Sequence, residues 1–414
     1  MRYGKIKMMK ISAIGGIFLF LMLMVVLQSM NVVPFYYLTT YILAICWLML
    51  IVIISSNMNI RNNFRTCSKI IVLFAIPWII FILYNVFLYS SGIVVNDYMK
   101  SSFIQIMFMP ITILYALSLC IVFKRKASRY LIYSFIIGYI MIVIYAFVKG
   151  GPLVIVNTIM SLLTGEDGIN YFEVSSDLIY ALGIFFVYYL FNKNIFELRD
   201  IKESKHLWLV LIFIFLGLKR IQILAMIAVI VISLVFKIFS YKRRLIQLIE
   251  NIVCIIFTIG AFFYVSIIQN HELSLFLWKQ GVNTMGRIQM YDYMATYFDF
   301  SNKYLGNGYN FSNFTLANAG YMYTLHNDIL KIFIDLGFWI FLLWIIYSLF
   351  IQRFVIYKKY GKHAEVVYFL MTIYMFVLYF TDNAINYFIT QTAYIVLTTI
   401  SILRDNENVQ KTRK

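Results

Sequence analysis

A polar stretch from His271 to Phe341 interrupts an otherwise apolar chain and holds most of the residues whose types could do chemistry. It contains Met285-Gly286-Arg287, then a Gly-x-Gly segment at Leu305–Tyr309, and then Leu325-His326-Asn327-Asp328, which leads directly into the apolar run Ile329–Phe350. An arginine holds anions through its forked donors, and a histidine takes up a proton near neutral pH. If the protein is an enzyme, we expect its active site in this stretch.

Arg287 begins a segment, Gly286–Phe300, whose apolar residues recur at helical spacing. Free backbone N–H groups and the helix dipole at the start of such a helix favour an anion. Arg287 would then complete a phosphate clamp, or it would form a structural ion pair, and the sequence leaves both interpretations open. For the segment as a whole, the alternative is a helix that lies in the membrane interface.

The Gly-x-Gly segment places Gly306 and Gly308 just before Tyr309. This pattern indicates a turn that needs positive φ, or a backbone that passes close to a ligand. Aromatic rings with polar tips stand around it, and such rings fit either sugar faces or a membrane interface. They are Tyr293, Tyr297, Tyr304, Tyr309, Tyr321 and Tyr323.

His326 is one of 4 histidines and stands immediately before an apolar run. Imidazole can act as a general base, although a lone histidine is more often only a polar contact. In the helix that follows, Lys331 lies three residues after Asp328 and four before Asp335, so the three side chains share a face and can neutralise one another. Buried charges of this kind favour an internal polar cavity over a lipid-facing wall.

A second basic site, Lys219-Arg220, lies inside the apolar stretch Leu207–Phe236, which at 30 residues is long for one span and short for two. Both flanks of this stretch are basic and therefore predicted to be cytoplasmic. We predict a hairpin that turns at Gly217–Arg220 below the outer membrane surface, with Arg220 facing protein or a water-filled cavity. A charge at that depth costs about 2.5 to 3.5 kcal/mol, so we favour an anion-binding arginine; a snorkelling pair at an ordinary turn is the alternative.

The composition is that of a polytopic membrane protein. Of 414 residues, 62% are hydrophobic and 13% charged, and the mean hydropathy is +0.83. Repeated apolar runs of about 20 residues predict an all-α fold rather than a barrel. We expect a single transmembrane domain over residues 1–414, with a first outer loop at 149–177 and a large outer loop at 270–328 before the tenth helix. The twelve spans are placed near 11–30, 35–54, 70–89, 103–123, 130–148, 178–191, 207–218, 221–236, 251–269, 329–350, 364–380 and 386–403.

The net charge of +17 is a topology signal rather than a sign of nucleic-acid binding. With both termini cytoplasmic, the cytoplasmic segments hold 27 of the 35 Lys and Arg residues, as the positive-inside rule requires. The four cysteines are scattered singly, which indicates buried fillers rather than a disulfide framework or a zinc site. Carboxylates of the first outer loop match no calcium loop, and we expect them on a solvated face. These are Glu166, Asp167, Glu173 and Asp177.

In their order and topology these motifs resemble the bacterial O-antigen ligase and polymerase superfamily. The resemblance rests on the short turn with Arg220, the outer loop that opens with Gly286-Arg287 and continues to a Gly-x-Gly turn, and His326-Asn327-Asp328 at the start of an apolar helix that continues to Asp335-Leu336-Gly337. The chain departs from the family pattern at Lys219, where a serine usually precedes the turn arginine. It also departs at Tyr291, where a tryptophan usually follows the loop arginine.

The resemblance implies a glycosyltransferase without metal or other cofactor at the outer face of the cytoplasmic membrane of a bacterium. Its donor would be an undecaprenyl-diphosphate-linked oligosaccharide, with Arg220 and Arg287 holding the diphosphate and His326 orienting or deprotonating the acceptor hydroxyl. Membrane lipid, a chain-length regulator and a flippase are expected partners. Further substrate contacts are expected from Lys219, Tyr291, Gly306, Gly308, Tyr309, Asn327 and Asp328.

The leading hypothesis is a polymerase that joins lipid-linked repeat units into O-antigen, capsule or exopolysaccharide. A ligase that moves finished glycan to a lipid or wall acceptor needs the same diphosphate clamp and base. A flippase for lipid-linked sugars is the alternative outside this class. Transporters commonly carry paired repeats, whereas the polar features here cluster in the second half of the chain and on one side of the membrane.

Overall fold

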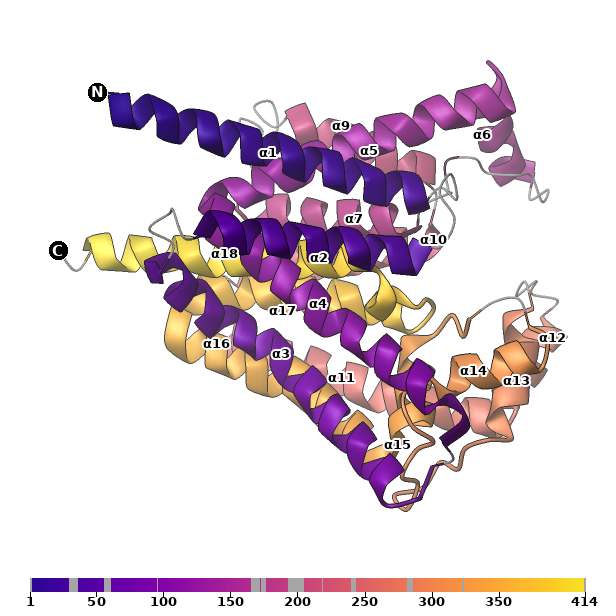
Figure 1. Cartoon of the computed structure of the whole chain (residues 1–414). Helices are drawn as coiled ribbons and strands as arrows, with labels where there is room; N and C mark the ends of the chain where they lie inside the picture. Colours follow the sequence, from indigo (N-terminus) through magenta and orange to yellow (C-terminus); the bar gives the residue numbers. More distant parts are fainter. Residues whose placement is uncertain are drawn as a thin grey trace. The chain divides into compact units, whose positions relative to one another are not determined.

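The computed structural model is helical in the part of the chain that it describes, with no strand there (Figure 1). The described residues are 2–29, 36–55, 61–94, 96–164, 172, 176–192, 205–217, 219–239, 243–280, 286–321 and 324–412. The all-α prediction is therefore confirmed for these residues. They fall into two compact units, one formed by 1–71, 111–223 and 387–414 and the other by 72–110 and 224–386. That the whole chain forms one membrane domain stays a prediction.

The first unit holds α1 (Arg2–Ser29), α2 (Tyr36–Ser55), η2 (Lys124–Lys126), α5 (Ala127–Gly150), α6 (Val154–Thr164), α7 (Ser176–Asn192), α9 (Lys205–Gly217) and α18 (Phe388–Thr412). Asp177, expected on a solvated face, is instead buried, and that expectation is wrong for it. Its carboxylate accepts hydrogen bonds from Ile389 N (2.9 Å) and Thr390 N (2.7 Å), the free donors at the start of α18. The other three acidic residues of that loop lie outside the described residues.

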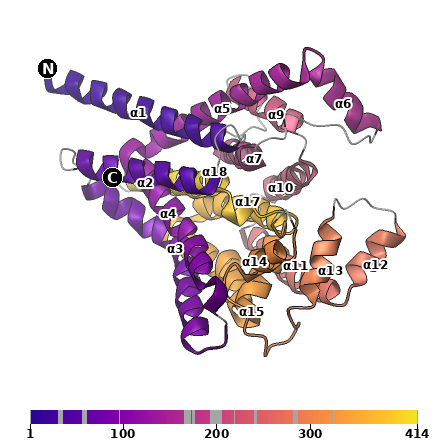
Figure 2. The ribbon, with the colours of Figure 1, turned by 45° about the vertical axis from the view of Figure 1, so that its right-hand side comes forward.

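The second unit holds η1 (Asn96–Tyr98), α11 (Arg243–Gln269), α12 (Glu272–Lys279), α13 (Arg287–Ala295), α14 (Phe311–Asn318), α15 (Asp328–Ile346), η4 (Tyr347–Ile351), α16 (Gln352–Tyr360), α17 (Lys362–Tyr379) and η5 (Ala384–Asn386). Helices α3 (Arg61–Ser90), α4 (Met99–Phe123) and α10 (Arg220–Ile238) have residues in both units. The predicted large outer loop is thus itself helical, with α12, α13 and α14 packed side by side (Figures 1 and 2). The one helix expected there ends at Ala295, earlier than Phe300.

Five helical segments of the described residues are long and apolar enough to cross a membrane. They are Cys67–Ser90, Met99–Gly150, Arg220–Ile238, Arg243–Gln269 and Asp328–Tyr360, beside shorter apolar helices such as Leu207–Gly217. Each predicted span contains a helix, which agrees with a polytopic membrane protein. The number of twelve crossings and the cytoplasmic position of both termini stay predictions.

Helix α9 ends at Gly217 and α10 begins at Arg220, so a break between two helices falls where the turn was predicted. That the two helices form a hairpin stays a prediction. The Lys219 carbonyl accepts the first hydrogen bonds of α10, from Gln222 N (2.9 Å) and Ile223 N (3.2 Å). The Gln222 side chain donates to the Ile179 carbonyl of α7 at 2.7 Å and holds the turn in place. The side chain of Arg220 is exposed. Its position below the outer membrane surface and its anion-binding role stay predictions beside the snorkelling alternative.

Helix α15 is broken at Gly337, which has φ 75° and ψ 177°. The segment 304–308 lies against the break, because a Cβ built on Gly306 would come within 2.5 Å of Gly337 N. A Cβ on Gly337 would lie 2.3 Å from the carbonyl carbon of Leu305. Only two glycines allow the two backbones to approach this closely. The carbonyls that the break frees are paired by Asn307 N to Ile334 O (3.2 Å) and Gly308 N to Asp335 O (2.8 Å).

Replacing Gly337 by alanine should destabilise the protein strongly. The added Cβ combines a left-handed backbone with overpacking, each of which costs about 1 to 3 kcal/mol. The measurement is thermal unfolding of the purified protein in detergent. Gly260→Ala is the matched control, since a Cβ at this helical glycine of α11 meets nothing within 4 Å and should be neutral or mildly stabilising. Equal melting temperatures for Gly337→Ala and Gly260→Ala would contradict this account of the break.

Candidate active site

Arg287 is the first residue of α13, after Gly286, as the sequence predicts. The buried side of α13 holds Met290, Tyr291 and Met294, which fixes the helix against the unit. The guanidinium Nη1 of Arg287 donates to the Thr381 carbonyl at 2.9 Å. The acceptor is a backbone carbonyl and not a carboxylate. Among the described residues, Arg287 has no carboxylate with which it forms an ion pair. That Arg287 binds a ligand anion stays a prediction.

His326 lies beside Asp382, with 3.2 Å between Nδ1 and Oδ1. The histidine side chain is 26% exposed and the aspartate side chain 5%. The Asp382 carboxylate also accepts from Asn383 N at 2.9 Å, which orients it. In the tautomer that directs Nδ1–H at this carboxylate, Nε2 carries the lone pair that can accept a proton. The geometry suits an oriented general base, and that role for His326 stays a prediction.

Three segments meet at the His326–Asp382 pair: α13, the residues just before α15, and the loop after α17. Arg287 reaches Thr381, and His326 reaches the next residue, Asp382. Tyr291 of α13 donates from its hydroxyl to the His326 carbonyl at 3.0 Å. Burial raises the pKa of the Tyr291 phenol, so this hydroxyl keeps its proton and stays a donor. The arginine, the histidine and the aspartate are therefore brought together by contacts from α13 and the loop after α17.

Asn327 and Asp328 are buried and hold the start of α15. Asn327 caps the helix by accepting from Leu330 N at 2.9 Å and donates to the Tyr264 hydroxyl at 2.9 Å. Asp328 N donates to the Asp382 carbonyl (3.2 Å), and its carboxylate accepts from Ile385 N (2.7 Å). These bonds position His326 against the segment that carries Asp382. Their predicted role as substrate contacts stays untested beside this positioning role.

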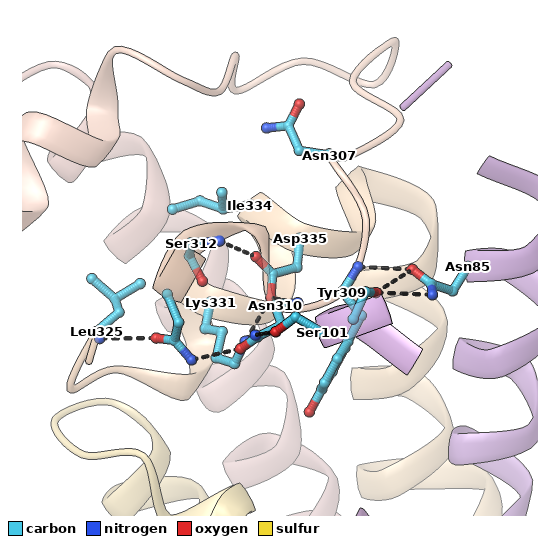
Figure 3. Close-up of polar contacts among 12 residues, drawn as sticks. Asn85, Ser101, Asn307, Tyr309, Asn310, Ser312, Leu325, Lys331, Ile334 and Asp335 are labelled. Carbon is cyan, nitrogen blue, oxygen red and sulfur yellow. Dashed lines mark hydrogen bonds and ion pairs between the residues drawn. The ribbon is translucent and has the colours of Figure 1, made fainter. Parts of the chain in front are cut away.

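Lys331 and Asp335 form a buried ion pair at 2.6 Å, as their spacing predicted (Figure 3). The same carboxylate accepts from Asn310 N (2.7 Å) and Ser312 N (2.9 Å) at the start of α14. The Lys331 Nζ also lies 4.6 Å from the centre of the Tyr309 ring. These charges are satisfied within the protein and join α14 to α15. Asp328 does not complete an ion pair with them; it takes Ile385 N instead.

The predicted ligand contacts of Gly306, Gly308 and Tyr309 remain predictions, and the structure gives each a packing role. Gly306 lies against the α15 break, and a Cβ on Gly308 would meet Tyr89 and Val94 at 3.3 Å. Tyr309 is buried, and its N–H donates to Asn85 Oδ1 at 2.8 Å. Lys219 and Arg220 belong to the first unit, and Arg287 and His326 to the second.

Sequence reasoning missed Asp382 and Thr381. Asp382 lies 56 residues from His326 along the chain, so no local spacing joins them. A signal was present, because Asp382-Asn383 stands between the last two predicted spans, on the side that the charge distribution makes outer. Among the described residues, no group of three or more His, Cys, Asp or Glu side chains forms a metal-binding cluster.

Fold and site together define a helical, polytopic membrane protein in which an arginine and an aspartate-paired histidine contact adjacent residues of one segment. Residues 206–345 match the family model described as O-antigen ligase. This match confirms the resemblance to the O-antigen ligase and polymerase superfamily, and it covers Arg220, Arg287 and His326. It supports an enzyme of ligase or polymerase type with a lipid-linked glycan substrate. A search of curated proteins finds no significant match to the chain.

Proposed function

We propose that this protein is a polysaccharide polymerase that joins undecaprenyl-diphosphate-linked oligosaccharide repeat units at the outer face of the cytoplasmic membrane. The observation that carries the proposal is the pairing of His326 with Asp382 next to the Thr381 carbonyl that Arg287 binds. A base and a cation that contact adjacent residues of one segment suit a reaction that removes a proton and releases an anion. The match over residues 206–345 supports the same class.

In the proposed reaction an acceptor sugar hydroxyl attacks the anomeric carbon of the donor sugar. The hydroxyl proton passes to Nε2 of His326, and the imidazolium is stabilised by Asp382. The bond between the anomeric carbon and the diphosphate oxygen breaks, and its electron pair leaves with the diphosphate. A single displacement of this kind inverts the anomeric centre.

Arg287 would stabilise the negative charge that develops on the leaving diphosphate. It lies at the N-terminal end of α13, where free N–H groups add to the attraction. Guanidinium groups suit phosphate oxygens because they donate two parallel hydrogen bonds. The exposed Arg220 belongs to the other unit, and its binding of diphosphate rests on the sequence alone.

A ligase that moves finished glycan to a lipid or wall acceptor is the second candidate, favoured by the description of the matching family. Polymerase and ligase need the same base and the same diphosphate clamp, so they differ only in the acceptor. The acceptor is therefore what the experiment has to identify.

The test is the size distribution of surface glycan and carrier-linked glycan in a strain that lacks this protein, with and without the wild-type gene. For a polymerase, long chains disappear and single repeat units stay on the carrier or surface. For a ligase, full-length polymer accumulates on the carrier. Unchanged glycan in both places would overturn both candidates and return attention to a flippase or an unrelated role.

A further inference from the structure

Five of the six tyrosines that surround the Gly-x-Gly segment in the sequence are described by the structure, and they divide into two groups. Tyr304 and Tyr309 point inward: Tyr304 donates to the Ile334 carbonyl at 2.6 Å, and Tyr309 is buried. Tyr293, Tyr297 and Tyr321 instead gather at the surface of α13 and the end of α14. Tyr323 lies outside the described residues. The first group serves the core of the unit, and the second needs another explanation.

The surface group forms one connected platform. The Tyr293 and Tyr297 rings lie 5.3 Å apart, with 2.9 Å between their hydroxyl oxygens. The Tyr293 and Tyr321 rings lie 5.6 Å apart, and the Tyr297 ring lies 5.8 Å from Phe311. We call Tyr293, Tyr297 and Tyr321 the tyrosine platform. It presents aromatic faces and phenol hydroxyls together.

The backbone under the platform is fixed. The Asn307 amide donates to the Tyr297 carbonyl at 3.0 Å. Tyr321 follows Gly320, which has a φ of +81° and ends α14 in a Schellman motif. In this motif Tyr321 N donates to Leu316 O at 3.0 Å, and Gly320 N donates to Ala317 O at 3.1 Å. A platform held in this way loses little conformational entropy when a ligand settles on it.

The surroundings of the platform are polar, unlike those of a membrane contact. Neighbouring exposed residues are Thr296, Asp299 and Asn318. By contrast, α12 exposes Leu275, Phe276 and Trp278 and follows directly on the membrane-type helix α11. Among the described residues of this loop, the most exposed large apolar side chains are therefore those of α12.

We infer that the tyrosine platform binds the glycan portion of the lipid-linked substrate, which rests on the proposed function. Rings with polar tips match a sugar, which offers an apolar face and hydroxyl groups. The platform and Arg287 belong to one helix and its end. Tyr293 lies about 9 Å from Arg287 along the helix, at 1.5 Å per residue, and Tyr297 follows two residues after the helix ends. The diphosphate at Arg287 and the sugars at the platform would thus be held by the same element, which Tyr291 ties to His326.

The test uses the full-length protein in lipid nanodiscs. The probe is the free oligosaccharide released by mild acid from carrier-linked glycan that accumulates in a strain lacking this protein, with binding followed by saturation-transfer NMR. The double variant Tyr293→Leu/Tyr297→Leu should weaken binding about tenfold, equivalent to about 1.4 kcal/mol. Tyr293→Phe/Tyr297→Phe keeps the rings and should lose less. Trp278→Leu on α12 is the matched control and should bind as wild type does.

The proposed role of the platform would be overturned if the double leucine variant bound the oligosaccharide as well as wild type does. It would also be overturned if Trp278→Leu lost as much binding as the double leucine variant, which would indicate a membrane belt. Absence of binding to the wild-type protein would also overturn it. His326→Ala separates the two proposals, because it should bind the oligosaccharide normally even though turnover is lost. Oligosaccharide bound through the tyrosines by a protein that performs no glycosyl transfer would sink the proposed function and leave the platform standing.

Discussion

His326→Ala should lower the rate of glycosyl transfer about 100- to 10,000-fold, the usual contribution of a positioned general base. The reason is that Nε2 would no longer take the acceptor proton while the anomeric bond forms. Asp382→Asn should give a smaller loss, since an amide holds the imidazole in the wrong tautomer and leaves the imidazolium unpaired. The measurement is transfer by purified enzyme with lipid-linked repeat units, with kcat and KM determined separately. The loss should fall on kcat.

The chain supplies a matched control for His326. His271 belongs to the same loop and also pairs with an aspartate, with 2.9 Å between its Nδ1 and Asp292 Oδ1, but it is more exposed, at 49% against 26%. His271→Ala should therefore transfer glycan at nearly the wild-type rate. If His271→Ala and His326→Ala lost activity equally, a general weakening of the loop would explain both, and the base would have to be sought elsewhere.

Local sequence patterns predicted a good part of the fold. The helix break before Arg220 follows from the length of one apolar stretch and the basic residues on both sides of it. The start of α13 at Arg287 follows from helical spacing after a glycine, and the Lys331–Asp335 pair follows from their separation of four residues. In each case the deciding residues are neighbours in sequence, so periodicity and charge suffice.

The break in α15 could not be predicted in the same way. Residues 329–350 form one apolar run, and a single glycine inside a helix is usually tolerated. The break exists because a segment about 30 residues earlier, around Gly306, packs its backbone against Gly337. Only the tertiary fold shows that two glycines so far apart in sequence serve one contact.

The site divides along the same line. His326 and Arg287 stood out as rare residues at the start of predicted helices. Asp382 carries no such local mark, and its role depends on the loop after α17 folding back onto the start of α15 through Asp328. The capping role of Asp177 was missed for the same reason, since the α18 donors that it binds lie more than 200 residues away.

Arg287→Ala should lower transfer about 100- to 1,000-fold, the loss typical when one donor to a developing anion is removed. Inorganic diphosphate, a mimic of the leaving group, should inhibit the wild-type enzyme and inhibit this variant much less. Lys303, an exposed cation of the same loop, gives the control, and Lys303→Ala should retain both activity and inhibition. Equal inhibition of wild type and Arg287→Ala by diphosphate would show that Arg287 does not bind the diphosphate.

The contact between Arg287 and the Thr381 carbonyl requires a further pair of variants, because truncation of Arg287 also releases the segment that carries Asp382. Glutamine can still donate to the carbonyl but carries no charge, whereas lysine keeps the charge and loses the fork. If Arg287 serves the leaving group, Arg287→Lys should retain more activity and more diphosphate inhibition than Arg287→Gln. The opposite order would mean that Arg287 acts through Thr381, as a positioning residue for the His326–Asp382 pair, and not on the leaving group.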